Sequence, residues 1–169
     1  IIGLFLFLFQ RKMTFNTSGM PKKPREYGLS NIKEVFINTS DNLSLLAWFH
    51  FPKNKSPILI YFHGNSFDIG ERAYRIERYI KIGWGVLLVS WRGYSGTKGK
   101  PTEKNLYIDG EAAIKWVENN TDYHKNNIIL YGESLGCAVA VELGLQKKFK
   151  SIILEAPFTS LVDIAKKKY

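Results

Sequence analysis

Short apolar runs of strand length alternate along the chain with longer segments in which apolar residues recur at helical spacing. The apolar runs cover residues 58–62, 86–90, 128–131 and 151–154. The segments with helical spacing cover residues 71–82, 103–119 and 135–146. Apolar strands that alternate with amphipathic helices are typical of βαβ crossovers. The pattern therefore predicts an α/β fold, with a mostly parallel sheet and helices on both of its faces.

Two further runs with strand character precede this alternation. They cover residues 35–38 and 43–51 and flank the turn-rich sequence 39–42. Strand-like runs separated by a short polar turn are typical of an antiparallel pair. We therefore expect the sheet to open with two antiparallel strands.

The sequence Gly132-Glu133-Ser134-Leu135-Gly136 joins the apolar run 128–131 to the helical segment that follows. A serine at the apex of a sharp strand-to-helix turn forms a nucleophile elbow. Such a turn predicts a strained backbone at Ser134 and a hydroxyl that projects above the sheet, and it requires small residues at Gly132 and Gly136. The alternative is a glycine-rich helix start in which Ser134 is an ordinary capping residue.

A second motif, His63-Gly64-Asn65, directly follows the apolar run 58–62. In enzymes built on a nucleophile elbow, the loop after this earlier strand donates one backbone N–H to the oxyanion hole, and the residue after the nucleophile donates the other. The predicted donors are therefore Asn65 and Leu135. We interpret His63 and Gly64 as residues that shape the turn, because the general base of such enzymes comes later in the chain.

Two more motifs follow in order, Ser90-Trp91-Arg92-Gly93-Tyr94-Ser95-Gly96-Thr97 and Leu154-Glu155-Ala156-Pro157-Phe158-Thr159-Ser160. With the two motifs above, they make the chain resemble the α/β-hydrolase superfamily over about residues 30 to 169. It looks most similar to the membrane-anchored α/β-hydrolase domain-containing branch, which includes protein depalmitoylases and lysophospholipid lipases. The resemblance implies a serine hydrolase that needs neither a cofactor nor a metal ion.

The resemblance also implies that the acid and the histidine of a catalytic triad follow the serine in the chain. No histidine follows Ser134 in this sequence. The three histidines that precede it are His50, His63 and His124. We therefore expect the histidine, and an aspartate as the acid, beyond Tyr169, so that the chain holds only the amino-terminal portion of the fold. Glu155 is the weaker candidate for the acid, and its alternative role is to pair locally with a lysine or with backbone amides.

The glycine- and lysine-rich sequence 92–100 does not match a phosphate-binding loop. The Walker pattern requires a glycine where Tyr94 stands and a serine or threonine where Pro101 stands. We favour a structural role for Arg92, in which it pairs with a buried carboxylate, over a role in substrate binding. Asp109 and Asp163 are interpreted as charges on helix surfaces.

The first nine residues are apolar, which is fewer than the roughly 20 that a membrane-spanning helix needs. We interpret residues 1–12 as the remnant of a membrane anchor or of a signal peptide, and favour an uncleaved anchor because no small-residue cleavage site follows. Residues 13–30 are interpreted as a basic linker and residues 31–169 as the hydrolase domain. Basic residues directly after the apolar segment predict a domain that faces the cytoplasm.

The chain carries 24 Lys and Arg against 15 Asp and Glu, a net charge of +9. The basic residues are mostly lysine and are dispersed, and no nucleic-acid motif accompanies them. We therefore expect no nucleic-acid partner, and assign the charge to attraction toward an anionic membrane surface. The single cysteine, Cys137, excludes an intramolecular disulfide and is expected to be a small buried side chain.

The leading hypothesis is a serine hydrolase that cleaves carboxylic esters or thioesters through an acyl-enzyme on Ser134. The implied anchor and the family resemblance point to acyl chains on lipids or on lipidated proteins as substrates. Two alternatives stay open. One is a non-catalytic relative that keeps the elbow for folding and serves as a membrane-tethered binding module, and the other is an enzyme that transfers the acyl group to an alcohol or an amine.

Overall fold

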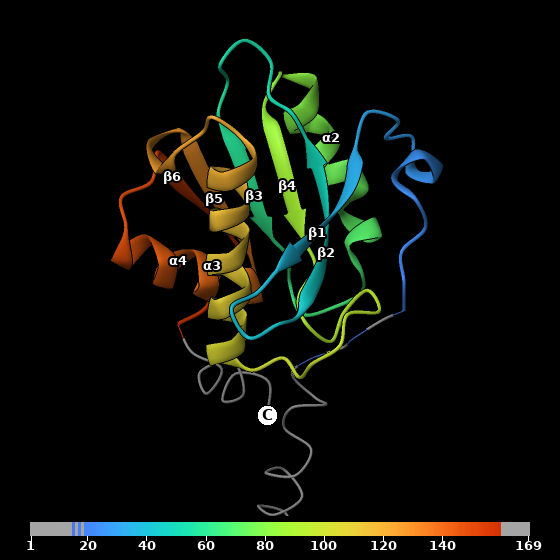
Figure 1. The fold of residues 1–169 in the computed structure, drawn as a ribbon, viewed down its shortest axis with the longest axis vertical. Helices are drawn as coiled ribbons and strands as arrows, with labels where there is room; N and C mark the ends of the chain where they lie inside the picture. The colour runs from blue at the N-terminus through green and yellow to red at the C-terminus, as the bar shows by residue number, and fades with distance from the viewer. Residues whose placement is uncertain (1–14, 16, 18, 160–169) are drawn as a thin grey trace, which may run out of the picture.

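A computed structural model of the chain describes residue 15, residue 17 and residues 19–159. The segment 1–12, which the sequence predicts to be an anchor or signal remnant, lies outside the described residues, as does Asp163. The described residues form one sheet covered by helices (Figure 1).

The sheet has six strands in the order β1-β2-β4-β3-β5-β6 within the described part of the chain. Their bounds are β1 Lys33–Asn38, β2 Ser44–His50, β3 Ile58–Phe62, β4 Gly85–Val89, β5 Ile128–Glu133 and β6 Ser151–Glu155. Strands β1 and β2 pair antiparallel, and β2 is also antiparallel to β4. The pairs β3–β4, β3–β5 and β5–β6 are parallel. The predicted antiparallel opening and the mostly parallel sheet are thus confirmed.

Helices cover both faces of the sheet, as the sequence pattern predicts. The helical elements are η1 Pro24–Tyr27, η2 Ile69–Arg72, α2 Ala73–Lys81, α3 Glu103–Asn120, η3 Lys125–Asn127 and α4 Leu135–Gln146. Helix α2 packs on one face, whereas α3 and α4 pack together on the other. Figure 1 shows α3 and α4 as neighbours, well apart from α2.

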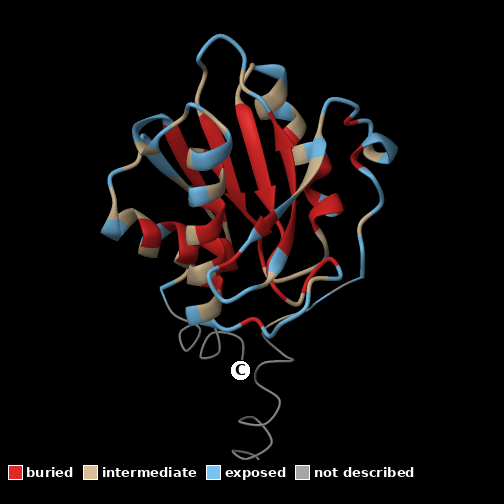
Figure 2. Ribbon diagram, viewed as in Figure 1, coloured by how far each residue is buried: buried red, intermediate tan, exposed pale blue. Residues whose placement is uncertain are grey.

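The central strands are apolar along their whole length because both of their faces are covered. All five residues of β3 and all five of β4 are buried, and the central strands form the red core of Figure 2. Ile60 and Phe62 pack on the side of α3 and α4, whereas Leu59 and Tyr61 pack on the side of α2. This alternation follows from the two-residue period of a strand.

The topology brings the candidate functional residues to one edge of the sheet. In parallel strands the carboxyl ends lie at the same edge, where functional loops of α/β proteins gather. Asn65 follows the carboxyl end of β3, Arg92 follows β4 and Ser134 follows β5. Glu155 closes β6 at the same edge, in register with Glu133 of β5.

Across the residues that the structure describes, no helix combines the length and the apolar character needed to cross a bilayer.

Arg92 lies in a buried ion pair, as the sequence predicts. Its partner is Asp109, a residue that the sequence pattern places on a helix surface. Its guanidinium donates to Oδ1 of Asp109 from Nε at 2.9 Å and from Nη2 at 2.6 Å, and its backbone N–H donates to Oδ2 at 3.0 Å. Asp109 is completely buried. The interpretation of Asp109 as a helix-surface charge was therefore wrong, because this position of α3 faces the core and Arg92 satisfies the carboxylate there.

The same guanidinium also holds the turn between β1 and β2. It donates to Asp41 from Nη1 at 2.6 Å and from Nη2 at 3.0 Å. Hydrogen bonds from Arg92 and Thr39 lower the pKa of Asp41 to about 2. Burial raises the pKa of Asp109, although the hydrogen bonds from Arg92 oppose that rise. One arginine thus ties the end of β4 to helix α3 and to the β1–β2 turn.

We predict that Asp109→Ala destabilises the protein by about 3–5 kcal/mol, because it leaves the Arg92 guanidinium buried without its main partner. Urea unfolding of the full-length protein at pH 7, followed by tryptophan fluorescence, measures the loss. Glu111→Ala, at a partly exposed position of the same helix, should change the free energy of unfolding by less than about 0.5 kcal/mol. Equal losses in the two variants would show that the ion pair is not what stabilises this region.

Candidate active site

Ser134 stands at a sharp turn between strand β5 and helix α4. Its backbone has φ 48° and ψ −109°, a combination that costs a residue with a side chain roughly 1–3 kcal/mol. The turn is held by its neighbours, since the Ser134 N–H donates to the carbonyl of Glu155 at 2.8 Å and the Ser134 carbonyl accepts from the Cys137 N–H at 2.9 Å. The strained elbow that the sequence predicts is therefore present.

The Ser134 side chain does not cap the helix. Ser134 occupies the N-cap position of α4, yet within the described residues its side chain makes no capping hydrogen bond. An ordinary capping serine has an extended backbone and accepts from an N–H of the first turn. The capping alternative thus does not account for Ser134, which is partly exposed.

Two glycines make the turn sterically feasible. A Cβ on Gly136 would lie 2.0 Å from the carbonyl oxygen of Phe62, and a Cβ on Gly132 would lie 2.5 Å from Cα of Cys137. Both contacts are with backbone, which cannot move aside without shifting a strand or a helix. The predicted requirement for small residues on each side of Ser134 is confirmed.

The same close approach places the start of α4 against the loop that follows β3. Strands β3 and β5 are neighbours, with Phe62 paired to Gly132. Gly136 packs on the backbone of Phe62, and Asn65 lies three residues farther along that loop. The two proposed oxyanion donors, the N–H groups of Asn65 and Leu135, thus lie on adjoining segments, and their catalytic role stays a prediction.

His63 is a buried loop residue. Its Nδ1 lies 2.7 Å from the carbonyl oxygen of Gly64, so Nδ1 carries the proton and donates. A peptide group is planar, so holding the Gly64 carbonyl also orients the Asn65 N–H. The Tyr94 hydroxyl donates to the Asn65 carbonyl at 2.8 Å and fixes the next peptide group. These contacts agree with the interpretation of His63 as a residue that shapes the turn.

Burial keeps the His63 imidazole neutral. Desolvation and the nearby charge of Arg72 lower its pKa to about 3, and its ring packs against Trp91 and Tyr94. The other two histidines lie elsewhere. His50 pairs with Val86 near the amino end of β4, and His124 precedes β5. Both are therefore at the edge of the sheet opposite Ser134.

Glu155 is engaged in local contacts on the α2 side of the sheet. Its carboxylate accepts from Nη1 of Arg75 at 2.5 and 2.6 Å and from the Tyr131 hydroxyl. The Tyr131 hydroxyl and Arg75 together lower its pKa. The sequence offered local pairing with a lysine as the alternative to an acid role, and the observed partner is an arginine. The role of Glu155 as a triad acid stays a prediction.

Glu133, the residue between Gly132 and Ser134, is part of the site although the sequence predicts no role for it. Its carboxylate accepts from Arg72 at 2.9 and 3.1 Å and from the Tyr61 hydroxyl at 2.9 Å. The position of Glu133 inside the elbow motif could have indicated a role at the site. Nothing in the local sequence, however, identifies Arg72 as the partner of its carboxylate. Cys137 is buried in α4, as predicted.

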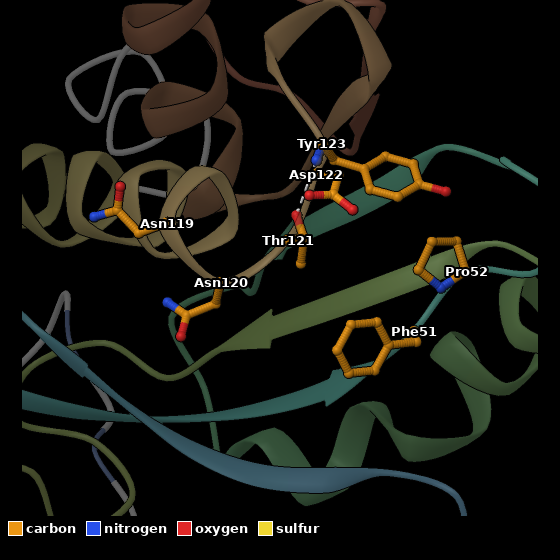
Figure 3. A pocket seen from close by; sticks show the side chains of 7 residues that line it. All are labelled: Phe51, Pro52, Asn119, Asn120, Thr121, Asp122 and Tyr123. Carbon is orange, nitrogen blue, oxygen red and sulfur yellow. Dashed lines mark hydrogen bonds between the residues drawn. The ribbon is translucent and has the colours of Figure 1, made fainter.

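A hollow of about 400 Å³ lies at the opposite edge of the sheet. Figure 3 shows its lining, which comes from the two residues after β2, from the end of α3 and from the loop between α3 and η3. The lining residues are Phe51, Pro52, Asn119, Asn120, Thr121, Asp122 and Tyr123. Thr121 accepts from the Tyr123 N–H at 3.2 Å, and the hollow is separate from the elbow.

No protein-family model matches the chain. An uncharacterized protein of Mycobacterium tuberculosis is 32% identical over 171 residues, which cover 99% of this chain and 61% of that relative. The alpha/beta hydrolase domain-containing protein WAV2 of Arabidopsis thaliana is 29% identical over 171 residues, 95% of this chain and 55% of that relative. The chain thus spans little more than half the length of these relatives.

The fold is also similar to solved structures. The esterase Pf2001 of Pyrococcus furiosus superposes with a TM-score of 0.70 at 26% sequence identity. The superposition covers 84% of this chain and 58% of the esterase.

We predict that Gly136→Ala lowers the free energy of unfolding by about 3 kcal/mol or more, the upper end of the cost of overpacking. Gly144→Ala on the same helix is the matched control. Its Cβ would meet the flexible end of Ile152, which is partly exposed and can move outward, so this change should stay within about 1 kcal/mol. Thermal unfolding of both variants tests the difference, and similar losses would contradict the steric role of Gly136.

We predict that His63 stays neutral down to about pH 4, since its pKa of about 3 lies below the roughly 6.5 of an unfolded histidine. The unfolded chain therefore binds this proton first, so the contribution of His63 to stability is complete above about pH 6.5 and is lost as the pH falls toward 3. The ¹⁵N shifts of the imidazole in an NMR titration report the protonation. A midpoint above pH 5 would contradict the burial of this ring.

Proposed function

Because the chain belongs to the α/β-hydrolase superfamily, we propose that the protein is a serine hydrolase that cleaves carboxylic esters or thioesters. The observation that carries the proposal is the backbone of Ser134, at φ 48° and ψ −109° between two glycines that tolerate no Cβ. Strain of this kind persists where the surrounding structure enforces it and is concentrated at functional sites.

In the proposed reaction, the Ser134 hydroxyl attacks the carbonyl carbon of the substrate and a general base takes its proton. The backbone N–H groups of Asn65 and Leu135 stabilise the oxyanion that forms, where each donor contributes roughly 3 kcal/mol to lowering the barrier. The intermediate collapses to an acyl-enzyme, and the leaving alcohol or thiol takes the proton. Water, activated by the same base, then releases the carboxylic acid.

We assign the general base to a histidine beyond Tyr169, together with an aspartate as the acid. Two observations support this assignment. His50 and His124 lie at the opposite edge of the sheet, and His63 is buried with its pKa lowered to about 3. The relatives that match this chain are also longer than it is.

The proposed substrates are acyl chains on lipids or on lipidated proteins, presented at a membrane surface that the domain faces from the cytoplasm. This part of the proposal is supported by the sequence, through its apolar first nine residues and its net charge of +9. Attraction of dispersed lysines toward anionic lipids brings an enzyme close to acyl substrates.

We predict that Ser134→Ala in the full-length protein lowers the hydrolysis of p-nitrophenyl butyrate and of an acyl thioester by at least about a thousandfold. The fold should be retained, with circular dichroism and thermal unfolding unchanged. Ser151→Ala, at the exposed start of β6, is the matched control and should keep full activity.

A fluorophosphonate gives an independent readout of the same serine. Mass spectrometry should find the label on the peptide that contains Ser134, and the Ser134→Ala variant should stay unlabelled. A folded full-length protein that neither reacts with the probe nor hydrolyses either substrate would favour the non-catalytic binding module instead.

A further inference from the structure

Glu133 directs its carboxylate away from helix α4 and toward Arg72. The two side chains form a bidentate ion pair, with Nη2 of Arg72 at 2.9 Å from Oε1 and Nε at 3.1 Å from Oε2. Arg72 is 6% exposed, so the pair is shielded from water. Burial alone would raise the pKa of Glu133, but Arg72 and the Tyr61 hydroxyl hold it below its usual value. The carboxylate is therefore charged and fixed in place.

The remaining nitrogen of Arg72 holds the loop that follows β3. Nη1 donates to the carbonyl oxygen of Ser66 at 2.6 Å and also lies 3.4 Å from that of Asp68. These two carbonyls flank Phe67, whose φ is 64°. Few residues with a large side chain adopt this conformation without support. One guanidinium thus joins the residue before Ser134 to the loop that carries Asn65.

Gly64 brings the loop backbone directly onto this ion pair. A Cβ on Gly64 would lie 3.2 Å from Oε1 of Glu133 and 3.5 Å from Nη2 of Arg72. Gly64, the glycine of the His-Gly-Asn motif, therefore packs closely against Glu133 of the elbow. The two residues are separated by about 70 residues of sequence. The loop is held from its other side by the Tyr94 hydroxyl, which donates to the Asn65 carbonyl at 2.8 Å.

We propose that the Arg72–Glu133 ion pair is a positioning device that sets the loop of Asn65 against the elbow, and so fixes the spacing of the two oxyanion donors. This inference rests on the proposed function. Neither residue is proposed to touch the substrate. Their effect passes through the backbone, because Glu133 precedes Ser134 and Leu135 in the elbow, and Arg72 donates to the carbonyl of Ser66, the residue after Asn65.

A positioning role and a merely structural role predict different kinetics. If the pair only stabilised the fold, the molecules that remain folded would keep their full turnover. If it positions the oxyanion donors, folded variants lose transition-state stabilisation while they still bind the substrate. The loss then falls on kcat and leaves KM nearly unchanged.

The test uses Glu133→Gln and Arg72→Lys in the full-length protein, with p-nitrophenyl butyrate as substrate. Glu133→Gln keeps the shape of the side chain and removes its charge, and Arg72→Lys keeps the charge and removes the fork that reaches Ser66. Each should lower kcat by roughly 10- to 100-fold, less than the loss of a whole oxyanion donor, with KM within about twofold. The double variant should lose no more than about twice the worse single variant, because the two residues act as one unit.

Two further variants serve as references. Arg78→Met removes one positive charge from an exposed position of α2 and should leave kcat unchanged. Tyr61→Phe removes the hydrogen bond from the Tyr61 hydroxyl to Glu133 but leaves both contacts between Glu133 and Arg72 in place, so it should cost less than about threefold. Rates are expressed per active site, counted by complete fluorophosphonate labelling, so that unfolded molecules do not enter the comparison.

The outcomes separate this inference from the proposed function. A wild-type protein without esterase activity would overturn the proposed function itself. An active wild type whose Glu133→Gln and Arg72→Lys variants keep kcat within twofold would overturn the positioning role alone. A raised KM with unchanged kcat would also overturn it, because the pair would then act on substrate binding. If Glu133→Gln lowers the folded fraction too far, Arg72→Lys alone decides between the same outcomes.

Discussion

The close approach of helix α4 to the end of strand β3 is the constraint on which the candidate site depends. The backbone of Gly136 lies so near the carbonyl of Phe62 that a Cβ there would stand 2.0 Å from its oxygen. Such contact forces the chain to turn sharply after β5, and the strained backbone of Ser134 results from it. The loop after β3 then begins beside the first turn of α4, and this adjacency brings together the segments that carry the two proposed oxyanion donors, Asn65 and Leu135.

Two buried arginines hold the loops at this edge through hydrogen bonds and ion pairs. Arg92 joins the end of β4 to helix α3 and to the β1–β2 turn, and Arg72 joins the elbow to the loop after β3. A buried ion pair adds little net stability over a well-packed apolar pair, because desolvating the charges is costly. Its bidentate geometry, however, allows only one arrangement of the segments that it joins. These arginines therefore specify loop positions more than they stabilise the core.

The sequence pattern predicted most of the fold and the strained turn at Ser134. Local sequence patterns predict the order of strands and helices along the chain, the antiparallel opening and the turn at Ser134. The spacing of apolar residues indicates which faces of a strand or helix are buried, and glycines indicate where two backbone segments approach closely. The predictions were weakest for charged side chains. Asp109 was placed on a surface although it is completely buried, and Glu155 pairs with Arg75 rather than with a lysine.

The sequence by itself determined the α/β class, the edge at which the candidate residues gather and the need for glycine at positions 132 and 136. The class and the shared edge follow from how apolar strands and amphipathic helices alternate along the chain, and the two glycines follow from the sharp turn that the local motif predicts. Only the tertiary structure decided which carboxylate faces which arginine. Arg72 and Glu133 are 61 residues apart, and Arg92 and Asp41 are 51 apart. Such pairs depend on strand order and helix packing, because a charged side chain finds its partner only when distant segments are brought together.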